Sequence, residues 1–109
     1  LTLLMIPITA FADEGPMNLP SGSNPEAVSH NKEGIASWNQ KDYKGALMHF
    51  SEASRIDGSS GEIHFNEAIC YDKIGKHGVA TKHFGVALKK AGGNKKLLNS
   101  PILKGHLGM

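Results

Sequence analysis

The stretch "ALMHFSEA", residues 46–53, is followed 34 positions later by "ATKHFGVA", residues 80–87. Both stretches begin and end with alanine and carry His-Phe at their fourth and fifth positions. Spacings of four and three residues place Ala46, Phe50 and Ala53 on one side of a helix. Two small residues beside one aromatic residue let a neighbouring helix approach within ~8–10 Å. The recurrence therefore predicts a repeated packing surface rather than a catalytic motif used twice.

The 34-residue period continues on both sides of these stretches, and each copy has the breaks expected for a helix, a short turn and a second helix. The further matched pairs are Gly34 and Ala68, Ile35 and Ile69, His30 and His64, Glu33 and Glu67, and Gly58 and Gly92. Capping residues and breaks predict helices at about 25–40, 43–56, 61–74 and 76–90, with short helical turns after Asn94 and after Ser100. No strand pattern competes, so the sequence predicts an all-α fold.

This pattern resembles the tetratricopeptide repeat (TPR), which shares its period and its small-residue, aromatic and alanine positions. The resemblance implies an α-solenoid of two helix-turn-helix repeats, residues 26–60 and 61–94, closed by a C-terminal capping helix at 95–109. It also implies which residues pack the helices of the repeats together. These are Gly34, Ala46, Phe50, Ala53, Ala68, Tyr71, Ala80, Phe84 and Ala87.

The first repeat departs from the family pattern, because Ser37 stands where an aromatic residue is expected and Trp38 follows one place later. Glycines at positions 45, 78 and 85 fall inside predicted helices, and each costs roughly 0.5–1 kcal/mol relative to alanine. A helix pair also cannot bury its apolar stripe alone. We therefore expect marginal stability, or a homo-oligomer that supplies the missing neighbour.

The first twelve residues, "LTLLMIPITAFA", are uncharged and apolar and end in a small-x-small pattern directly before Asp13-Glu14. This pattern predicts a secretory signal peptide cleaved after Ala12, and thus an exported protein, periplasmic or secreted. The alternative is an apolar N-terminal helix of the domain, which Pro7 disfavours. Residues 13–25, rich in Gly, Pro, Ser and Asn, are predicted to form a flexible linker.

In TPR proteins the first helices of successive repeats line a concave groove that holds a peptide. The resemblance therefore implies a groove lined by Asn31, Ile35, Trp38, Asn39, Phe65, Asn66, Ile69, Asp72 and Lys73. Trp38 and Phe65 are the apolar anchors expected to dominate recognition, although both could instead be buried between helices. Ile35 stands where chaperone-binding members have asparagine, so chaperone tails are not the expected ligand. The expected function is a non-catalytic protein–protein interaction scaffold that binds a peptide or assembles with copies of itself.

His49 and His83 occupy equivalent positions beside the two phenylalanines. A metal or catalytic site needs three or four groups that converge on one point. Translation by one repeat separates equivalent residues by about 10 Å or more. We therefore expect half-buried packing histidines at both positions.

The spacings His30-x-x-Glu33 and His64-x-x-Glu67 place an imidazole and a carboxylate on one helical face. The preferred interpretation is a His–Glu hydrogen bond between neighbouring repeats, with no metal and no cofactor. The alternative is a His-based metal-binding protein that uses these residues. Cys70, the only cysteine, is expected in the core, and the sequence carries no nucleophile elbow or phosphate-binding loop. An enzyme is therefore not expected.

Charge is distributed unevenly along the chain. Ten acidic and four basic residues lie at or before Asp72, whereas eight lysines and no acidic residue follow it. The lysines near the C-terminus are Lys89, Lys90, Lys95, Lys96 and Lys104. A second alternative is thus peripheral binding to an anionic membrane through this end. Export argues against a nucleic-acid partner.

Overall fold

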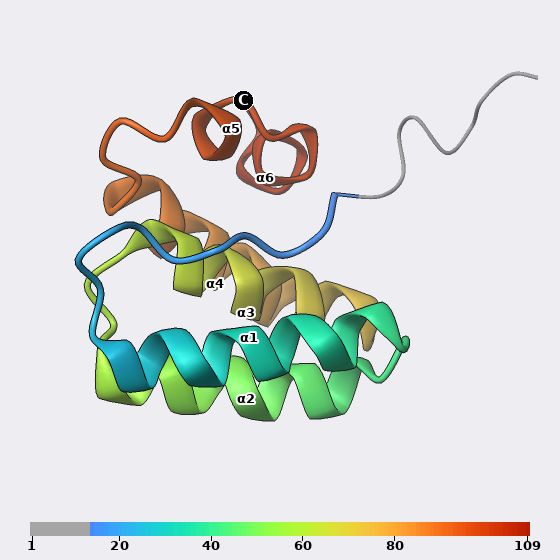
Figure 1. The fold of residues 1–109 in the computed structure, drawn as a ribbon. Coiled ribbons are helices and arrows are strands. Elements are labelled where there is room, and N and C mark those ends of the chain that lie inside the picture. Colours follow the sequence, from blue (N-terminus) through green and yellow to red (C-terminus); the bar gives the residue numbers. More distant parts are fainter. Residues whose placement is uncertain (1–13) are drawn as a thin grey trace, which may run out of the picture.

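The computed structural model describes residues 14–109, and in this part of the chain six α-helices and no strands are present (Figure 1). The prediction of an all-α fold is confirmed. The predicted signal peptide, residues 1–12, lies outside the described residues. The helices are α1 (Pro25–Asn39), α2 (Tyr43–Ile56), α3 (Gly61–Lys73), α4 (His77–Lys89), α5 (Lys95–Leu98) and α6 (Pro101–Leu107).

Short polar side chains begin most of the helices, because they accept hydrogen bonds from N–H groups that have no partner within the helix. Asn24 accepts from Glu26 and Ala27 at the start of α1. Asp42 accepts from the N–H of Gly45 at the start of α2, 2.9 Å away. Ser60, Asn94 and Ser100 cap α3, α5 and α6 in the same way.

The turn inside each repeat contains one residue with left-handed backbone. In the first repeat this residue is Lys41, with φ 63°, and in the second it is Gly75, with φ 86°. These positions are 34 residues apart, so the repeat is reproduced in its backbone conformation as well as in its packing. Glycine adopts this conformation without a steric penalty, whereas lysine does not.

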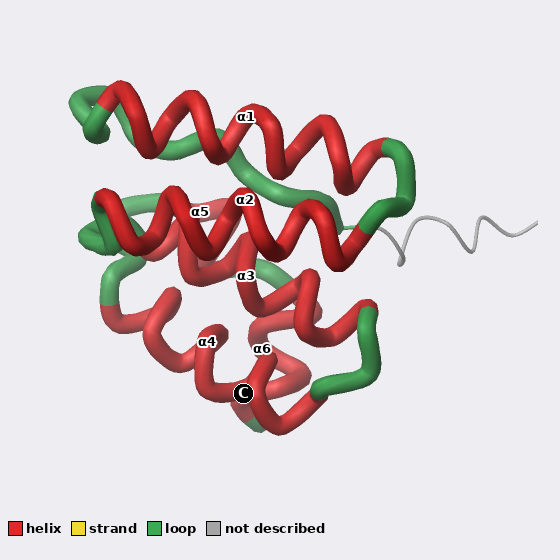
Figure 2. Tube along the Cα trace, turned by 90° about the horizontal axis from the view of Figure 1, so that it is seen from below, coloured by secondary structure: helices red, strands yellow, loops and turns green. Residues whose placement is uncertain are grey.

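The helices pack as two hairpins, α1 against α2 and α3 against α4, with α2 beside α3 (Figure 2). Close approach within the first hairpin depends on Gly34, since a Cβ at this position would lie 2.4 Å from Cε1 of Phe50. In the second hairpin Phe65 meets Phe84 edge-on, with ring centroids 5.6 Å apart. Tyr71 is half-buried and stacks on His83. The other implied packing positions are fully buried: Ala46, Phe50, Ala53, Ala68, Ala80, Phe84 and Ala87.

The C-terminal part forms two short helices rather than one. α5 lies against α3 and α4, and α6 lies against α4. Leu97 and Leu103 are fully buried in the same core cluster as Phe65 and Phe84. Residues 95–107 therefore cover apolar surface of the second hairpin.

Residues 14–20 run in an extended path between α1 and α3 on one side and α5 and α6 on the other, and a turn at residues 21–22 then leads the chain into α1 (Figure 1). This segment corresponds to the predicted flexible linker, but in the structure it has defined hydrogen-bond partners along its length. None of the described helices has the length and apolar character needed to cross a membrane.

Candidate functional site

The face made by α1 and α3 is the surface on which the sequence predicts a peptide-binding groove. Asn31 of α1 and Asn66 of α3 are 1% and 0% exposed, and both contact the main chain of Met17. The N–H of Met17 donates to Oδ1 of Asn66 at 2.8 Å. Its carbonyl accepts from Nδ2 of Asn66 at 2.8 Å and from Nδ2 of Asn31 at 3.1 Å. Both backbone groups of one residue in an extended chain are thereby held.

The two asparagines also hold each other, because Nδ2 of Asn66 donates to Oδ1 of Asn31 at 2.8 Å. A buried amide without a partner costs about 1–3 kcal/mol. The network among Asn31, Asn66 and Met17 satisfies these groups, and the two asparagines depend on the extended segment for part of this bonding. The face is therefore suited to an occupant that offers a peptide N–H and carbonyl.

Side chains of the segment are held as well. Met17 is 7% exposed and belongs to the core cluster of the second repeat and the C-terminal helices. The carboxylate of Glu14 accepts from the hydroxyl of Ser100 at 2.6 Å and from the N–H of Ile102 at 2.7 Å. At the other end of the segment, the N–H of Asn24 donates to Asp57 at 3.1 Å.

Apart from Asp72, the remaining residues of the predicted groove divide into two sets. Phe65 and Ile69 are 0% and 1% exposed and contribute to the core cluster that includes Met17. Ile35 is half-buried and packs against the core of the first repeat. The second set lies at the end of the face where α1 and α3 finish, and comprises Trp38, Asn39 and Lys73.

This second set lines a cavity of about 330 Å³ together with Lys41 and Tyr43, which the sequence interpretation did not include. The ammonium group of Lys73 lies 5.8 Å from the ring centroid of Trp38 and 5.4 Å from that of Tyr43. The two rings meet edge-on, with centroids 4.8 Å apart. Cations at such distances from an aromatic face are attracted to it. The cavity therefore combines apolar area with positive charge.

Asp72, the last predicted groove residue, contacts other helices instead of a groove. Its Oδ1 lies 2.5 Å from Nδ1 of His77 and 2.9 Å from Nε2 of His106. His106 also bonds Thr81, at 2.7 Å from Nδ1. Asp72 thereby joins α3 to α4 and α6.

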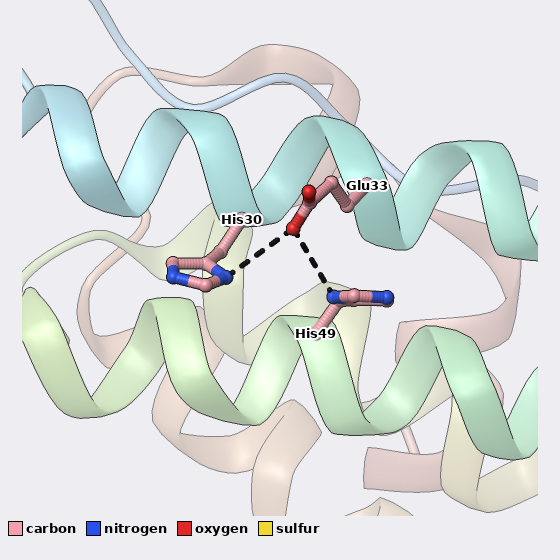
Figure 3. A group of neighbouring side chains, drawn as sticks. All are labelled: His30, Glu33 and His49. Carbon is pink, nitrogen blue, oxygen red and sulfur yellow. Dashed lines mark ion pairs between the residues drawn. The ribbon is translucent and has the colours of Figure 1, made fainter.

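The His–Glu pairs have a third member that the sequence interpretation placed elsewhere. His49 of α2 lies 3.4 Å from Oε1 of Glu33, which is also 3.4 Å from His30 (Figure 3). The expected bonds between neighbouring repeats are therefore replaced by contacts within one repeat. The partner of His49 is Glu33 on the adjacent helix of the same repeat. The signal that could have revealed this is that Glu33 and His49 recur together 34 residues later.

The second repeat has the same arrangement. Oε1 of Glu67 lies 3.2 Å from Nδ1 of His64 and 3.5 Å from Nδ1 of His83. The contact with Glu67 raises the pKa of His64, although burial opposes this. Burial favours the neutral form of Glu67, but the two histidines outweigh it and hold its pKa below the usual value.

The C-terminal lysines lie mostly on the surface of the protein. Lys89, Lys90, Lys95 and Lys96 are exposed, and Lys104 is half-buried. Lys90 donates to the carbonyl of Gly58 at 3.2 Å. Lysines near the C-terminal ends of helices commonly stabilise the helix, because their positive charge offsets the negative end of the helix dipole.

No protein-family profile matches the chain. Residues of the chain are 37% identical over 65 positions to sperm-associated antigen 1 from Homo sapiens, a protein that contains TPRs. Both the match and the paired helices fit a TPR-like protein. The match covers 60% of this chain but only 7% of the relative, so the chain spans a small part of that protein.

Proposed function

We propose that this chain is a non-catalytic protein-interaction module that binds an extended segment of another protein across the face of α1 and α3. The observation that carries the proposal is the capture of both backbone groups of Met17 by Asn31 and Asn66. Main-chain bonds of this kind give affinity for an extended peptide of any sequence, while side-chain pockets give selectivity. The TPR likeness supports the same class of function.

The contacts of the chain's own residues 14–24 indicate which groups a ligand should carry. A suitable ligand carries an apolar side chain at the place of Met17, which is buried, and a carboxylate three residues earlier, at the place of Glu14. Since the same contacts cannot be made twice, a partner segment competes with residues 14–24. The module would then exchange an internal peptide for an external one.

The cavity at Trp38 lies next to the path of the segment, because a Cβ added to Gly15 would lie 3.6 Å from Nε1 of Trp38. A ligand with a side chain at the place of Gly15 therefore gains access to the cavity. Lys41 and Lys73 in its lining favour a ligand group that carries negative charge. The cavity would thus distinguish a partner from the internal segment.

The test uses a variant whose residues 14–18 are replaced by glycine and serine, together with a synthetic peptide "EGPMNLPSGSN", residues 14–24. Trp38 is the only tryptophan of the chain and reports occupancy by its fluorescence. We expect saturable binding of the peptide. Asn66→Ala in the same background should weaken binding about tenfold or more, equivalent to about 1.4 kcal/mol.

Two controls make the result specific. A scrambled peptide of the same composition should bind more weakly, because it can keep the main-chain bonds but loses the side-chain contacts of Met17 and Glu14. Asn99→Ala, at an exposed asparagine whose side chain makes no hydrogen bond to residues 14–24, should leave the affinity unchanged. Equal binding of both peptides, or no binding by a folded variant, would contradict the proposed function.

A further inference from the structure

All six histidines of the chain lie beside a carboxylate, in three groups of two histidines and one acid. Two of these groups are copies related by the repeat: His30, Glu33 and His49, and then His64, Glu67 and His83. In both copies the same three atoms face each other, namely one Oε1 and two Nδ1 atoms. In the first copy, all three side chains point into the space between α1 and α2 (Figure 3).

The atoms of the second copy are buried, and their hydrogen bonding is incomplete. Nδ1 of His64, Nδ1 of His83 and Oε1 of Glu67 have no hydrogen-bond partner of normal geometry among the described residues. The side chain of Glu67 is only 7% exposed, so water does not readily replace the missing partners. A buried carboxylate oxygen without a partner is costly and calls for an explanation.

The tautomer of His64 places an acceptor atom against the carboxylate of Glu67. Its Nε2 lies 2.9 Å from the carbonyl of Gly58, and a carbonyl can only accept, so Nε2 carries the hydrogen. In the neutral ring, Nδ1 then presents a lone pair to the negatively charged oxygen of Glu67 at 3.2 Å. Two acceptors at this distance repel each other unless a positive species lies between them. A bond from Nε2 to a backbone carbonyl is also the usual way in which a protein orients a metal-ligating histidine.

The distances suit a metal ion. Ligands at 2.0–2.1 Å from a tetrahedral zinc ion are about 3.3 Å from one another. The separations between the carboxylate oxygen and the two histidine nitrogens are 3.2 and 3.5 Å in the second copy and 3.4 and 3.4 Å in the first. In both copies all three donor atoms lie within 4.8 Å of one another. We propose that each repeat binds one divalent transition-metal ion of the zinc type through its two Nδ1 atoms and its glutamate Oε1. The buried site at Glu67 is the tighter of the two.

The third group, Asp72 with His77 and His106, has shorter oxygen–nitrogen distances, which are typical of hydrogen bonds. Asp72 lies 2.5 and 2.9 Å from its two histidine nitrogens, which is closer than two ligands of one tetrahedral ion. His77 is also largely exposed, and the second nitrogen of His106 bonds Thr81. This group therefore serves as an internal control that keeps its histidines and carboxylate but lacks the ligand spacing.

A metal at these positions would cross-link the helices of each hairpin, α1 to α2 and α3 to α4. Three protein ligands leave one coordination position of a tetrahedral ion open for water or for an external ligand. Nitrogen and carboxylate oxygen donors are suited to zinc, and also to nickel and copper. The metal ligands would then recur with the 34-residue period, as the packing residues do.

The test is titration of the 109-residue chain, prepared without an affinity tag, with zinc chloride in a calorimeter, and with cobalt chloride monitored by visible absorption. We expect two equivalents of zinc and the intense absorption bands of tetrahedral cobalt. Glu67→Gln keeps the shape of the side chain and should remove the tighter step. Glu33→Gln should remove the weaker step, and the double variant should bind neither ion.

Asp72→Asn is the matched control and should retain both steps. Circular dichroism verifies that each variant is folded. If Glu67→Gln does not fold, His83→Ala, at a half-buried position, must remove the tighter step instead. Absence of zinc binding by the unaltered chain, or a tighter step that survives both Glu67→Gln and His83→Ala, would overturn the proposal and leave a proton as the positive species between His64 and Glu67.

Discussion

Asn31 and Asn66, from the first helices of the two repeats, donate to one and the same carbonyl, that of Met17. The two side chains are also bonded to each other at 2.8 Å. One peptide unit of an extended segment therefore connects α1 to α3. This connection is the basis for regarding the face as a peptide-binding surface.

Replacement of Asn66 by alanine should destabilise the protein. The change removes three hydrogen bonds and leaves the N–H and carbonyl of Met17 with fewer partners at a buried position. Loss of buried partners costs about 1–3 kcal/mol. Urea denaturation should report a loss of this size, whereas Asn99→Ala at an exposed position should change the free energy of unfolding little. Equal stability of Asn66→Ala and the unaltered chain would count against the network.

Gly34 and Gly85 provide opposite predictions for the same substitution. A Cβ at Gly34 would lie 2.4 Å from the fully buried ring of Phe50, so Gly34→Ala should destabilise by about 1–3 kcal/mol. At Gly85 nothing lies within 4 Å of the added atom, and alanine favours the helix by roughly 0.5–1 kcal/mol. Thermal unfolding should therefore show a lower melting temperature for Gly34→Ala and a higher one for Gly85→Ala. A shift in the same direction for both would contradict the close packing of α1 on α2.

Substitutions at Lys41 and Gly75, in the equivalent turns of the two repeats, should change the free energy of unfolding in opposite directions. Lys41 has φ 63°, a conformation that costs a side chain roughly 1–2 kcal/mol, so Lys41→Gly should stabilise by about 1 kcal/mol. Gly75 has φ 86° at the equivalent position, so Gly75→Ala should destabilise by about 1–2 kcal/mol. Chemical denaturation of both variants tests this. A destabilising Lys41→Gly would show that the turn is not the source of strain.

Cys70 should be unreactive in the folded protein. Burial, together with the nearby Glu67, raises the pKa of its thiol to about 12. Only the thiolate is nucleophilic, so almost none of the reactive form exists at pH 8. Ellman's reagent should label the thiol slowly in buffer and completely in guanidinium chloride. Rapid labelling under native conditions would place Cys70 outside the core.

The features that the sequence predicted well are those that a period reveals. Helix starts at Asn24 and Asp42 have side chains whose chemistry caps a helix wherever they occur. The small residue at position 34 and the ring of Phe50 recur with the repeat, so their contact could be expected. These features depend on neighbours in the sequence or on an equivalent residue one period later.

The features that the sequence did not reveal depend on contacts between distant parts of the chain. Met17 bonds Asn66 across 49 residues, and its segment is held through main-chain atoms, which leave no periodic signal. The contact between Glu33 and His49 depends on how α1 is set lengthwise against α2. The one sequence feature that points to this contact is that both residues recur together 34 positions later, as Glu67 and His83.

Amide exchange of Met17, followed by NMR, tests the central claim that the face of α1 and α3 holds an extended peptide by its main chain. We predict that the N–H of Met17, bonded to Asn66 at 2.8 Å, exchanges far more slowly than in the isolated peptide. Asn66→Ala should bring its exchange close to the rate of that peptide, while amides inside α2 remain protected. Exchange of Met17 at the rate of the isolated peptide in the unaltered protein would contradict the account.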